Sequence, residues 1–268
     1  MTRLAVEGLR ATHEDMRAVF AGLGDADWQR PSACAGWRVQ DVLAHVTSNF
    51  AEMIEPSPAP PEPASPALTA EQAMEALVAP RRQWSPAELL AEYERYCDGA
   101  LAALGAMQDE PTASTEIPLA DLGTYAMHWL ANAYCFDHYC HLRHDLLAPG
   151  GPLDAAVPAA DEARVRPGIE WMLAGMPQMC GDAMALVRGP LRLELTGAGG
   201  GTWTVHPAEA GALVTIEESG STAPTATITS GAHEFVSWGT KRSDWRAACT
   251  LGGDAGAAAA VLDSLNIV

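Results

Sequence analysis

The sequence predicts two domains, an all-α four-helix bundle followed by a small α+β domain. Apolar residues recur at helical spacing in four long segments of the first half of the chain. Beyond Pro158 the pattern changes to short β-like runs, separated by turns rich in glycine or proline. A chain of 268 residues is also long enough for two ordinary domains. We therefore expect the bundle over residues 1–155 and the α+β domain over residues 156–268.

The first two bundle helices are predicted from apolar spacing and from the residues that end them. Residues 4–23 carry an apolar stripe that is typical of one amphipathic helix. A second helix is expected over residues 39–54, ended by Pro56. Residues 56–66 are so rich in proline that we expect an exposed, stiff loop of polyproline geometry. Helical patterning resumes at Thr69.

The third and fourth bundle helices are predicted downstream of that loop. Ser85-Pro86-Ala87-Glu88 combines an N-cap serine, a proline at the first helical position and the glutamate of a capping box. It opens a helix that is expected to reach about Met107. Residues 118–147 carry many apolar side chains and only one glycine, Gly123, so we expect most of this segment to form the fourth helix.

The second domain is expected to begin with a helix over residues 161–187 and to end with one over residues 255–265. Between them lie four short β-like runs, at residues 191–195, 203–206, 212–216 and 226–229.

Composition excludes two classes of partner. Acidic residues outnumber basic ones 34 to 16, for a formal net charge of −18. Nucleic acids and anionic membranes are bound through lysine and arginine, so neither is expected as a partner. The N-terminus lacks an apolar signal core, and no run of about 18 apolar residues occurs, so we expect a cytoplasmic protein. We also expect a monomer, and the six cysteines, none in a CxxC pair, to be reduced thiols.

Three side chains form a candidate metal site. His45 lies in the second predicted helix, and Asp137 and His141 lie four residues apart in the fourth. That spacing places both side chains on one helix face. Two imidazoles and a carboxylate can hold one divalent metal such as Zn²⁺ and leave a coordination position open, as in catalytic sites. The alternatives are that His45 is a hydrogen-bonded core residue and that the pair only stabilises its helix.

The same helix offers further polar side chains. His144 and Asp145 are expected to contact the metal ligands on the side away from the metal. A carboxylate such as Asp145 can accept a hydrogen bond from a ligating imidazole and so fix its tautomer. For Asp145 a solvated position at the helix end is an equal alternative. His138 points away from Asp137 and is expected to be an ordinary boundary residue, and His128 is expected to be structural.

Other reactive or aromatic side chains near these positions are assigned to packing. Trp37 is expected to pack the loop before the second helix, because tryptophan buries a large area. No cysteine is nominated as a nucleophile, and Cys135 and Cys140, which flank the acid–histidine pair, are expected to pack within the helix.

Together these segments resemble the mycothiol-dependent maleylpyruvate isomerase family. The segment 37–45, ending in His45, and the later segments 136–141 and 145–146 are similar to the metal-binding pattern of that family. Residues 235–239 and 253–254, followed by an alanine-rich helix, are similar to its closing pattern. The resemblance implies a DinB-like four-helix bundle with a small C-terminal α+β domain. It also implies that His45, Asp137 and His141 act in catalysis as the metal ligands.

The resemblance further implies a metal-dependent enzyme that activates the thiol of mycothiol. In the isomerase reaction the thiolate adds to the alkene of maleylpyruvate, the bond rotates, and elimination gives the trans product. If the thiol instead stays attached to the electrophile, the enzyme is an S-transferase. The expected partners are therefore a small-molecule electrophile and a low-molecular-weight thiol, with Zn²⁺ or another divalent metal as cofactor. A non-catalytic protein that binds or sequesters a metal or small molecule is the alternative. The Ala- and Gly-rich composition fits an actinobacterial source.

Two positions depart from the family pattern. Asp137 stands where family members commonly carry glutamate, and Thr240 stands where an arginine often follows the Trp-Gly pair. Lys241, Arg242 and Arg246 form a small basic cluster nearby. They are expected either to bind the anionic substrate or thiol or to form a solvated face.

Overall fold

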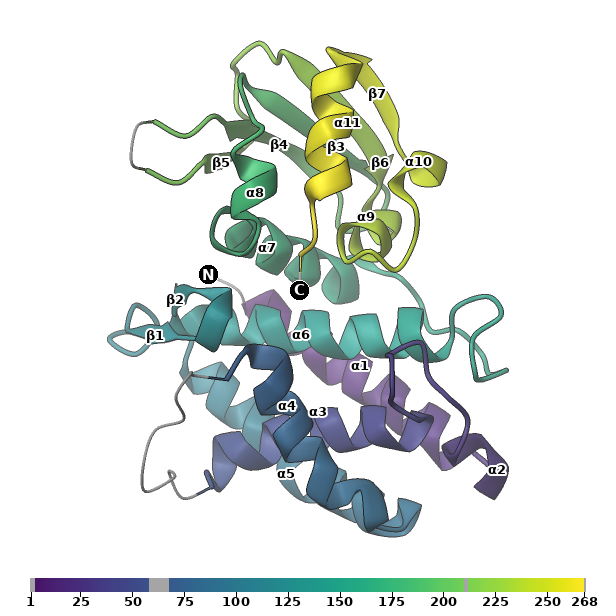
Figure 1. Ribbon diagram of the computed structural model, residues 1–268. Coiled ribbons are helices and arrows are strands. Elements are labelled where there is room, and N and C mark those ends of the chain that lie inside the picture. The colour runs from purple at the N-terminus through teal and green to yellow at the C-terminus, as the bar shows by residue number, and fades with distance from the viewer. Residues whose placement is uncertain (1–2, 58–67, 210–211, 268) are drawn as a thin grey trace. The chain divides into compact units, whose positions relative to one another are not determined.

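The structure is a computed structural model that describes residues 3–57, 68–209 and 212–267. The chain divides into two compact units, Met1–Ala159 and Ala160–Val268, which are described separately. The first unit is a helical bundle and the second contains a five-stranded sheet with helices, so the predicted fold class is confirmed (Figure 1).

The long helices α1, α3, α5 and α6 form the bundle of the first unit (Figure 1). α1 packs against α6 and α5, and α3 packs against α5 and the short helix α4. The helices of this unit are α1 (Arg3–Ala21), α2 (Asp25–Trp28), α3 (Val39–Ile54), α4 (Ala70–Val78), the 3₁₀ helix η1 (Ala79–Gln83), α5 (Pro86–Ala106) and α6 (Leu130–Cys140).

The predicted start of α5 is confirmed in its hydrogen bonds. The Ser85 hydroxyl accepts a bond from the Glu88 N–H at 3.3 Å, and the Glu88 carboxylate accepts one from the Ser85 N–H at 2.6 Å. This reciprocal cap satisfies two backbone groups that a helix start leaves unpaired. Thr69 and Gln72 form the same arrangement at the start of α4. Most of the stiff loop predicted over residues 56–66 lies outside the described residues.

The fourth bundle helix is shorter than predicted. The first part of residues 118–147 belongs to a small antiparallel hairpin and to single 3₁₀ turns, and the helix begins only at Leu130. Gly123 adopts φ 116°, which glycine tolerates and which a helix cannot contain. The elements are β1 (Glu116–Pro118), η2 (Ala120–Leu122), β2 (Thr124–Ala126) and η3 (Met127–Trp129). After α6 the chain continues as a π-helix, η4 (His141–Leu146).

One apolar core fills the bundle between these helices. Its fully buried members include Leu9, Met16 and Phe20 of α1, Leu43, Val46 and Phe50 of α3, Leu89, Tyr93 and Leu104 of α5, and Ala131, Cys135, Leu142 and Leu146 of α6 and η4. Burial of side chains of this size contributes about 1.5–3 kcal/mol each. The core therefore fixes the registry of α3 against α6 and η4, the two stretches that carry the candidate ligands.

The second unit is built on a mixed sheet with strand order β5-β4-β3-β6-β7, in which only β3 and β6 pair in parallel. α9 packs against β3 and β6, and α11 packs against β6 and β7. The strands are β3 (Leu191–Thr196), β4 (Gly201–His206), β5 (Thr215–Glu218), β6 (Ala226–Gly231) and β7 (Thr250–Gly253), and the helices are α7 (Glu162–Met179), α8 (Gly181–Met184), α9 (Ala232–Gly239), α10 (Trp245–Ala248) and α11 (Ala255–Ser264).

Two predictions for this unit need correction, and one strand was missed. The helix expected over residues 161–187 is divided, because Cys180 leaves helical geometry between α7 and α8. The strand expected over residues 212–216 lies at Thr215–Glu218, and β7 was not predicted. Both β5 and β7 lie at edges of the sheet, where little burial is required and the apolar pattern is correspondingly weak.

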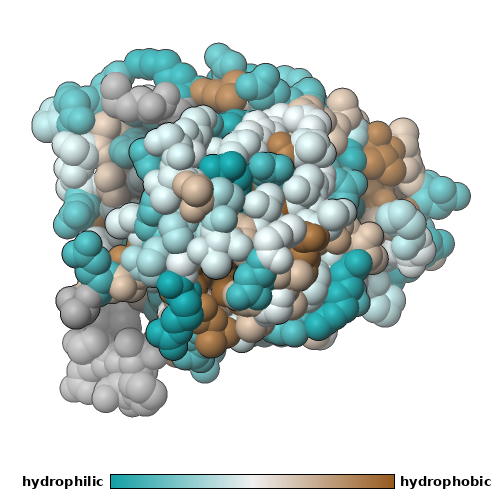
Figure 2. All heavy atoms as spheres, turned by 90° about the horizontal axis from the view of Figure 1, so that it is seen from above, coloured by the Kyte–Doolittle hydropathy of each residue, from teal (hydrophilic) through white to brown (hydrophobic). Residues whose placement is uncertain are grey.

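The surface seen in Figure 2 shows hydrophobic residues in small groups, separated by hydrophilic and neutral ones. Such scattered groups are normal for a protein surface. Among the described helices, none has the length and apolar character that spanning a membrane requires.

Candidate functional site

The structure brings His45, Asp137 and His141 together. The Nε2 atom of His45 lies 2.9 Å from Oδ1 of Asp137, and Nε2 of His141 lies 3.4 Å from the same oxygen. One donor atom from each of the three side chains lies within 4.8 Å of the others. α3 supplies His45, the last turn of α6 supplies Asp137, and His141 begins the π-helix η4.

Opposite charges decide the protonation of these groups. Burial alone would raise the pKa of Asp137, but the imidazoles of His45 and His141 outweigh it and hold the pKa well below its usual range. Burial would likewise lower the pKa of His141, but the charge of Asp137, together with the hydrogen bonds that His141 makes with Asp137, Asp145 and Cys34, raises it well above the usual range. The arrangement is therefore a carboxylate that lies between two imidazoles. The exposed fraction of the side chain is 6% for His45, 24% for Asp137 and 10% for His141.

This donor set fits a divalent metal. Two imidazole nitrogens and one carboxylate oxygen that converge from different helices form the kind of three-ligand set found at catalytic zinc sites. The second ring nitrogen of His141 already has the carboxylate partner that ligating histidines usually have, because Nδ1 donates to Oδ2 of Asp145 at 2.8 Å. The described residues provide no hydrogen-bond partner for Nδ1 of His45.

Cys34 lies behind His141, on the side away from Asp137. Its Sγ atom is 3.2 Å from Oδ2 of Asp145 and 3.6 Å from Nδ1 of His141. The sequence alone does not distinguish this cysteine from the other five, which are all expected to be reduced thiols. Its position three residues before Trp37, in the loop that leads to the His45 helix, is the one signal that points to it.

The loop that carries Cys34 and Trp37 is closed by its own hydrogen bonds. The backbone N–H and the hydroxyl of Ser32 both donate to the carbonyl of Trp37, each at 2.9 Å. Gly36 turns the chain with φ 81°, a conformation that favours glycine. The N–H of Ala33 donates to the carbonyl of Asp145 at 3.1 Å, which ties the loop to η4.

Trp37 touches both imidazoles of the candidate site. Its ring centroid lies 5.2 Å from that of His45 and 6.2 Å from that of His141. The indole N–H donates to Glu75 of α4 at 3.0 Å. Trp37 therefore does more than pack its loop, because its indole also forms an apolar wall beside the donor atoms.

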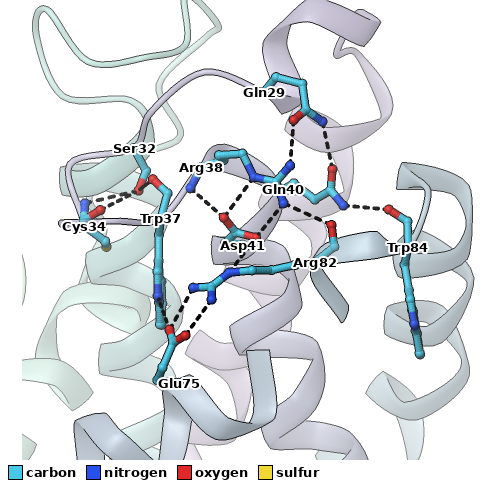
Figure 3. Close-up of polar contacts among 10 residues, drawn as sticks. All are labelled: Gln29, Ser32, Cys34, Trp37, Arg38, Gln40, Asp41, Glu75, Arg82 and Trp84. Carbon is cyan, nitrogen blue, oxygen red and sulfur yellow. Dashed lines mark hydrogen bonds and ion pairs between the residues drawn. The ribbon is translucent and has the colours of Figure 1, made fainter. Parts of the chain in front are cut away.

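A network of polar side chains from α3, α4 and η1 contacts Trp37 through Glu75 (Figure 3). The guanidinium of Arg82 pairs with both oxygens of Glu75, at 2.6 and 2.8 Å. Arg38 binds both oxygens of Asp41, at 2.9 and 3.0 Å, and Nε of Arg82 lies 3.8 Å from the same carboxylate. The Asp41 side chain is only 2% exposed, and hydrogen bonds from Arg38 satisfy both oxygens of the buried carboxylate.

The other polar residues predicted on the fourth helix lie in different surroundings. Asp145 is buried and is held by His141 and Cys34, so it is not a solvated carboxylate at a helix end. His144 packs edge-on against Tyr139, with ring centroids 6.0 Å apart, and its supporting function stays a prediction. His138 is fully buried, and the expectation of a boundary residue was wrong. His128 packs beside Trp129, before the start of α6.

The basic cluster of the second unit makes contacts within that unit. Nζ of Lys241 donates to the carbonyls of Leu262 and Asp263 at the end of α11, at 3.2 and 3.1 Å. Arg246 pairs with the Asp263 carboxylate at 2.8 Å. Arg242 is exposed, and its backbone N–H donates to the backbone carbonyl of Ser237 at 2.9 Å. Cations at a helix C-terminus stabilise it, so Lys241 and Arg246 have a structural function whatever else they do.

Thr240 ends α9 beside this cluster. Its hydroxyl donates to the carbonyls of Val236 and Ser237, at 2.8 and 3.1 Å, and the residue is buried. The short side chain is thus directed back into its own helix, where an arginine could not be accommodated in the same way.

Comparison with known proteins gives a consistent result. No curated protein matches the sequence. Among the solved structures that match in fold are the mycothiol-dependent maleylpyruvate isomerase and a mutant of it. They are 14% and 13% identical in sequence, and both have a TM-score of 0.54 over 92% of this chain and 91% of theirs. The sequence pattern of the mycothiol maleylpyruvate isomerase N-terminal domain matches residues 9–146, more than half of the chain, and the protein therefore belongs to this family.

Proposed function

We propose that this protein is a divalent-metal-dependent enzyme that activates the thiol of mycothiol for addition to an electrophilic small molecule. The convergence of Nε2 of His45, Oδ1 of Asp137 and Nε2 of His141 within 4.8 Å carries this proposal. These three side chains would hold the metal, with Zn²⁺ favoured by a mixed nitrogen and oxygen donor set. A bound zinc ion would supply a strong positive charge that keeps a coordinated thiol deprotonated at neutral pH.

The surrounding residues hold these donors in place. Asp145 accepts the Nδ1 proton of His141, which directs the lone pair of Nε2 toward Asp137 and His45. Asp137 sits between the two imidazoles, so its carboxylate stays ionised and available as a ligand. Trp37 covers one side of both rings and excludes water there, and the Glu75–Arg82 pair fixes its orientation.

The reaction proposed is addition of a thiol sulfur to an electron-poor carbon. Elimination of the thiol after bond rotation gives cis–trans isomerisation, as in maleylpyruvate isomerases, and retention of the thiol gives S-transfer. Lys241, Arg242 and Arg246 are proposed as contacts for an anionic substrate or thiol. Because Lys241 and Arg246 also support α11, their binding function has to be tested by substrate affinity rather than by loss of activity alone.

The test combines metal content with thiol-dependent turnover. The parent protein, loaded with Zn²⁺, is incubated with maleylpyruvate with and without mycothiol, and the products are separated by chromatography and mass spectrometry. We expect turnover only with both metal and thiol, and its loss in His45→Ala and His141→Ala. His128→Gln is the matched control, because this histidine lies in the same unit away from the three donors. A parent that binds no added zinc, or turnover that survives in His141→Ala, would contradict the proposal.

A further inference from the structure

We propose that Cys34, His141 and Asp145 form a second metal site, which takes a soft ion through a thiolate and alternates with the site formed by His45, Asp137 and His141. The donor atoms are Sγ of Cys34, Nδ1 of His141 and Oδ2 of Asp145. Oδ2 lies 2.8 Å from Nδ1 and 3.2 Å from Sγ, and Sγ lies 3.6 Å from Nδ1. These three donors form a compact triangle on the opposite side of the His141 ring from Asp137.

The distances are close to those that a tetrahedral ion requires. Ligands at zinc bond lengths of about 2.0–2.3 Å are roughly 3.3–3.5 Å apart. The two distances that involve sulfur already lie near this range. Only the Asp145–His141 pair has to open by about half an ångström. Cys34 lies on a loop rather than within a helix, so its side chain can adjust more easily than those of η4.

Burial favours occupation by a cation. The Asp145 side chain is 2% exposed and that of His141 is 10% exposed, whereas Cys34 is half-buried and gives access from solvent. A carboxylate removed from water in this way is costly unless positive charge or hydrogen bonds compensate it. In the structure Nδ1 of His141 and Sγ of Cys34 provide this compensation, and a cation bound by the same three side chains would take their place. Cys34 is a free thiol, so it is available as a ligand.

The tautomer of His141 makes the two sites alternatives. A neutral imidazole has one lone pair and one N–H. When Nε2 is the ligand, Nδ1–H donates to Asp145, at 2.8 Å. When Nδ1 is the ligand, Nε2–H faces Asp137, whose Oδ1 lies 3.4 Å away. Each carboxylate thus serves as a ligand in one state and as the acceptor of the ring N–H in the other, and the pair of sites holds one ion at a time.

The chemistry of the ion selects between the sites. Thiolate favours soft ions such as Cd²⁺ or Cu⁺, whereas the nitrogen and oxygen set suits borderline and harder divalent ions. Binding at the second site releases the Cys34 proton to solvent, and the ring proton of His141 moves from Nδ1 to Nε2 through exchange with water. A soft ion at the second site would therefore occupy His141 and block the proposed catalytic site.

Titration with Cd²⁺ alone tests this proposal, with the ultraviolet thiolate-to-cadmium charge-transfer band as the readout. We expect one ion per chain with a strong band in the parent, and loss of the band in Cys34→Ser and in Asp145→Asn. His45→Ala should keep the band, because it removes only the first site. Cys249→Ser, which changes another half-buried free thiol, is the matched control and should behave as the parent.

Circular dichroism of each variant shows whether it folds, and Cys34→Ala provides a second substitution if Cys34→Ser does not. A band that persists in both Cys34 variants, that disappears in His45→Ala, or that accompanies two ions per chain would overturn the proposal. His45→Ala lacks a ligand of the proposed catalytic site, so a band in this variant supports the second site even if the proposed function fails.

Discussion

His138 and His141 are both buried in the bundle and lie three residues apart, but one is surrounded by aromatic rings and the other by carboxylates. His138 lies in an aromatic region of the core, where its ring stacks on Phe50 with centroids 4.9 Å apart. Its Nδ1 donates to the carbonyl of Tyr134 at 3.1 Å. His138 is fully buried, and desolvation lowers its pKa to about 3, although the nearby charge of Asp137 opposes this. His138 is therefore neutral under ordinary conditions.

His141, at the start of η4, lies instead between two carboxylates. Asp137 faces one ring nitrogen and Asp145 faces the other. His141 is also buried, but its pKa lies well above the usual value, because the negative charges outweigh desolvation. Burial alone therefore does not make a histidine a candidate ligand. Charged partners on both ring nitrogens distinguish the candidate ligand from the core histidine.

The largest expected effect comes from removing the central charge. Asp137→Asn keeps the size of the side chain but loses the carboxylate that both imidazoles face. We expect the affinity for Zn²⁺, measured by calorimetry, to fall at least about 100-fold, or ~2.7 kcal/mol. Asp137→Glu, which restores a carboxylate on a longer side chain, should bind zinc. Equal affinities of the asparagine variant and the parent would remove Asp137 from the ligand set.

The aromatic region should respond to pH rather than to metal. His13 packs against Tyr93, with ring centroids 4.8 Å apart, and burial lowers its pKa from 6.5 to about 4. As the pH falls from 6.5 to 4, the unfolded state binds a proton that the folded state does not bind, so the protein loses stability. At ~1.4 kcal/mol per pH unit this group contributes a loss of about 3 kcal/mol.

Urea unfolding of the parent and of His13→Gln at pH 7 and pH 4 measures this contribution. The difference in unfolding free energy between the two pH values should be smaller in the variant by about 2–3 kcal/mol. Phe20→Leu changes another buried aromatic side chain of α1 without removing a titratable group, and it should keep the pH dependence of the parent. If His13→Gln also keeps it, the acid loss of stability arises elsewhere.

A smaller effect is expected behind the candidate ligand. Asp145→Asn keeps an acceptor for the Nδ1 proton of His141 but removes the charge. Second-sphere partners of this kind contribute about 10- to 100-fold to metal affinity. Calorimetry with Zn²⁺ should therefore show weaker binding than in the parent but tighter binding than in Asp137→Asn. The reverse order would mean that Asp145, rather than Asp137, provides the ligand for zinc.

A substitution of Trp37, which lies beside the donor atoms, is expected to change stability and metal response least. Trp37→Phe removes the hydrogen bond to Glu75 and keeps an aromatic ring near His45 and His141. We expect a loss of about 1 kcal/mol in stability, the usual contribution of one such bond. Quenching of tryptophan fluorescence by added Co²⁺ should decrease clearly in this variant, because the indole beside His45 and His141 is absent. Unchanged quenching would place the metal away from Trp37.

Local sequence signals are sufficient to predict several helices of the bundle and the start of one of them. The helical stretch Val39–Ile54 and the cap of Ser85 on Glu88 were predicted from apolar spacing and capping residues that act within a few positions. The sequence also indicated His45, Asp137 and His141 as a set. A four-residue spacing and the family resemblance were sufficient to point to them.

The surroundings of His45, Asp137 and His141 depend on the tertiary structure as well. Cys34 and Trp37 reach the site because their loop is bound to Asp145 and Glu75, far away in sequence. Full burial of His138 likewise depends on packing between helices. The two carboxylates beside His141, in contrast, stand four residues before and after it in one helical stretch and follow from local spacing. Local patterns report the period and the ends of a helix, whereas the pKa and ligand environment of a side chain depend on contacts between distant segments, which neither spacing nor composition contains.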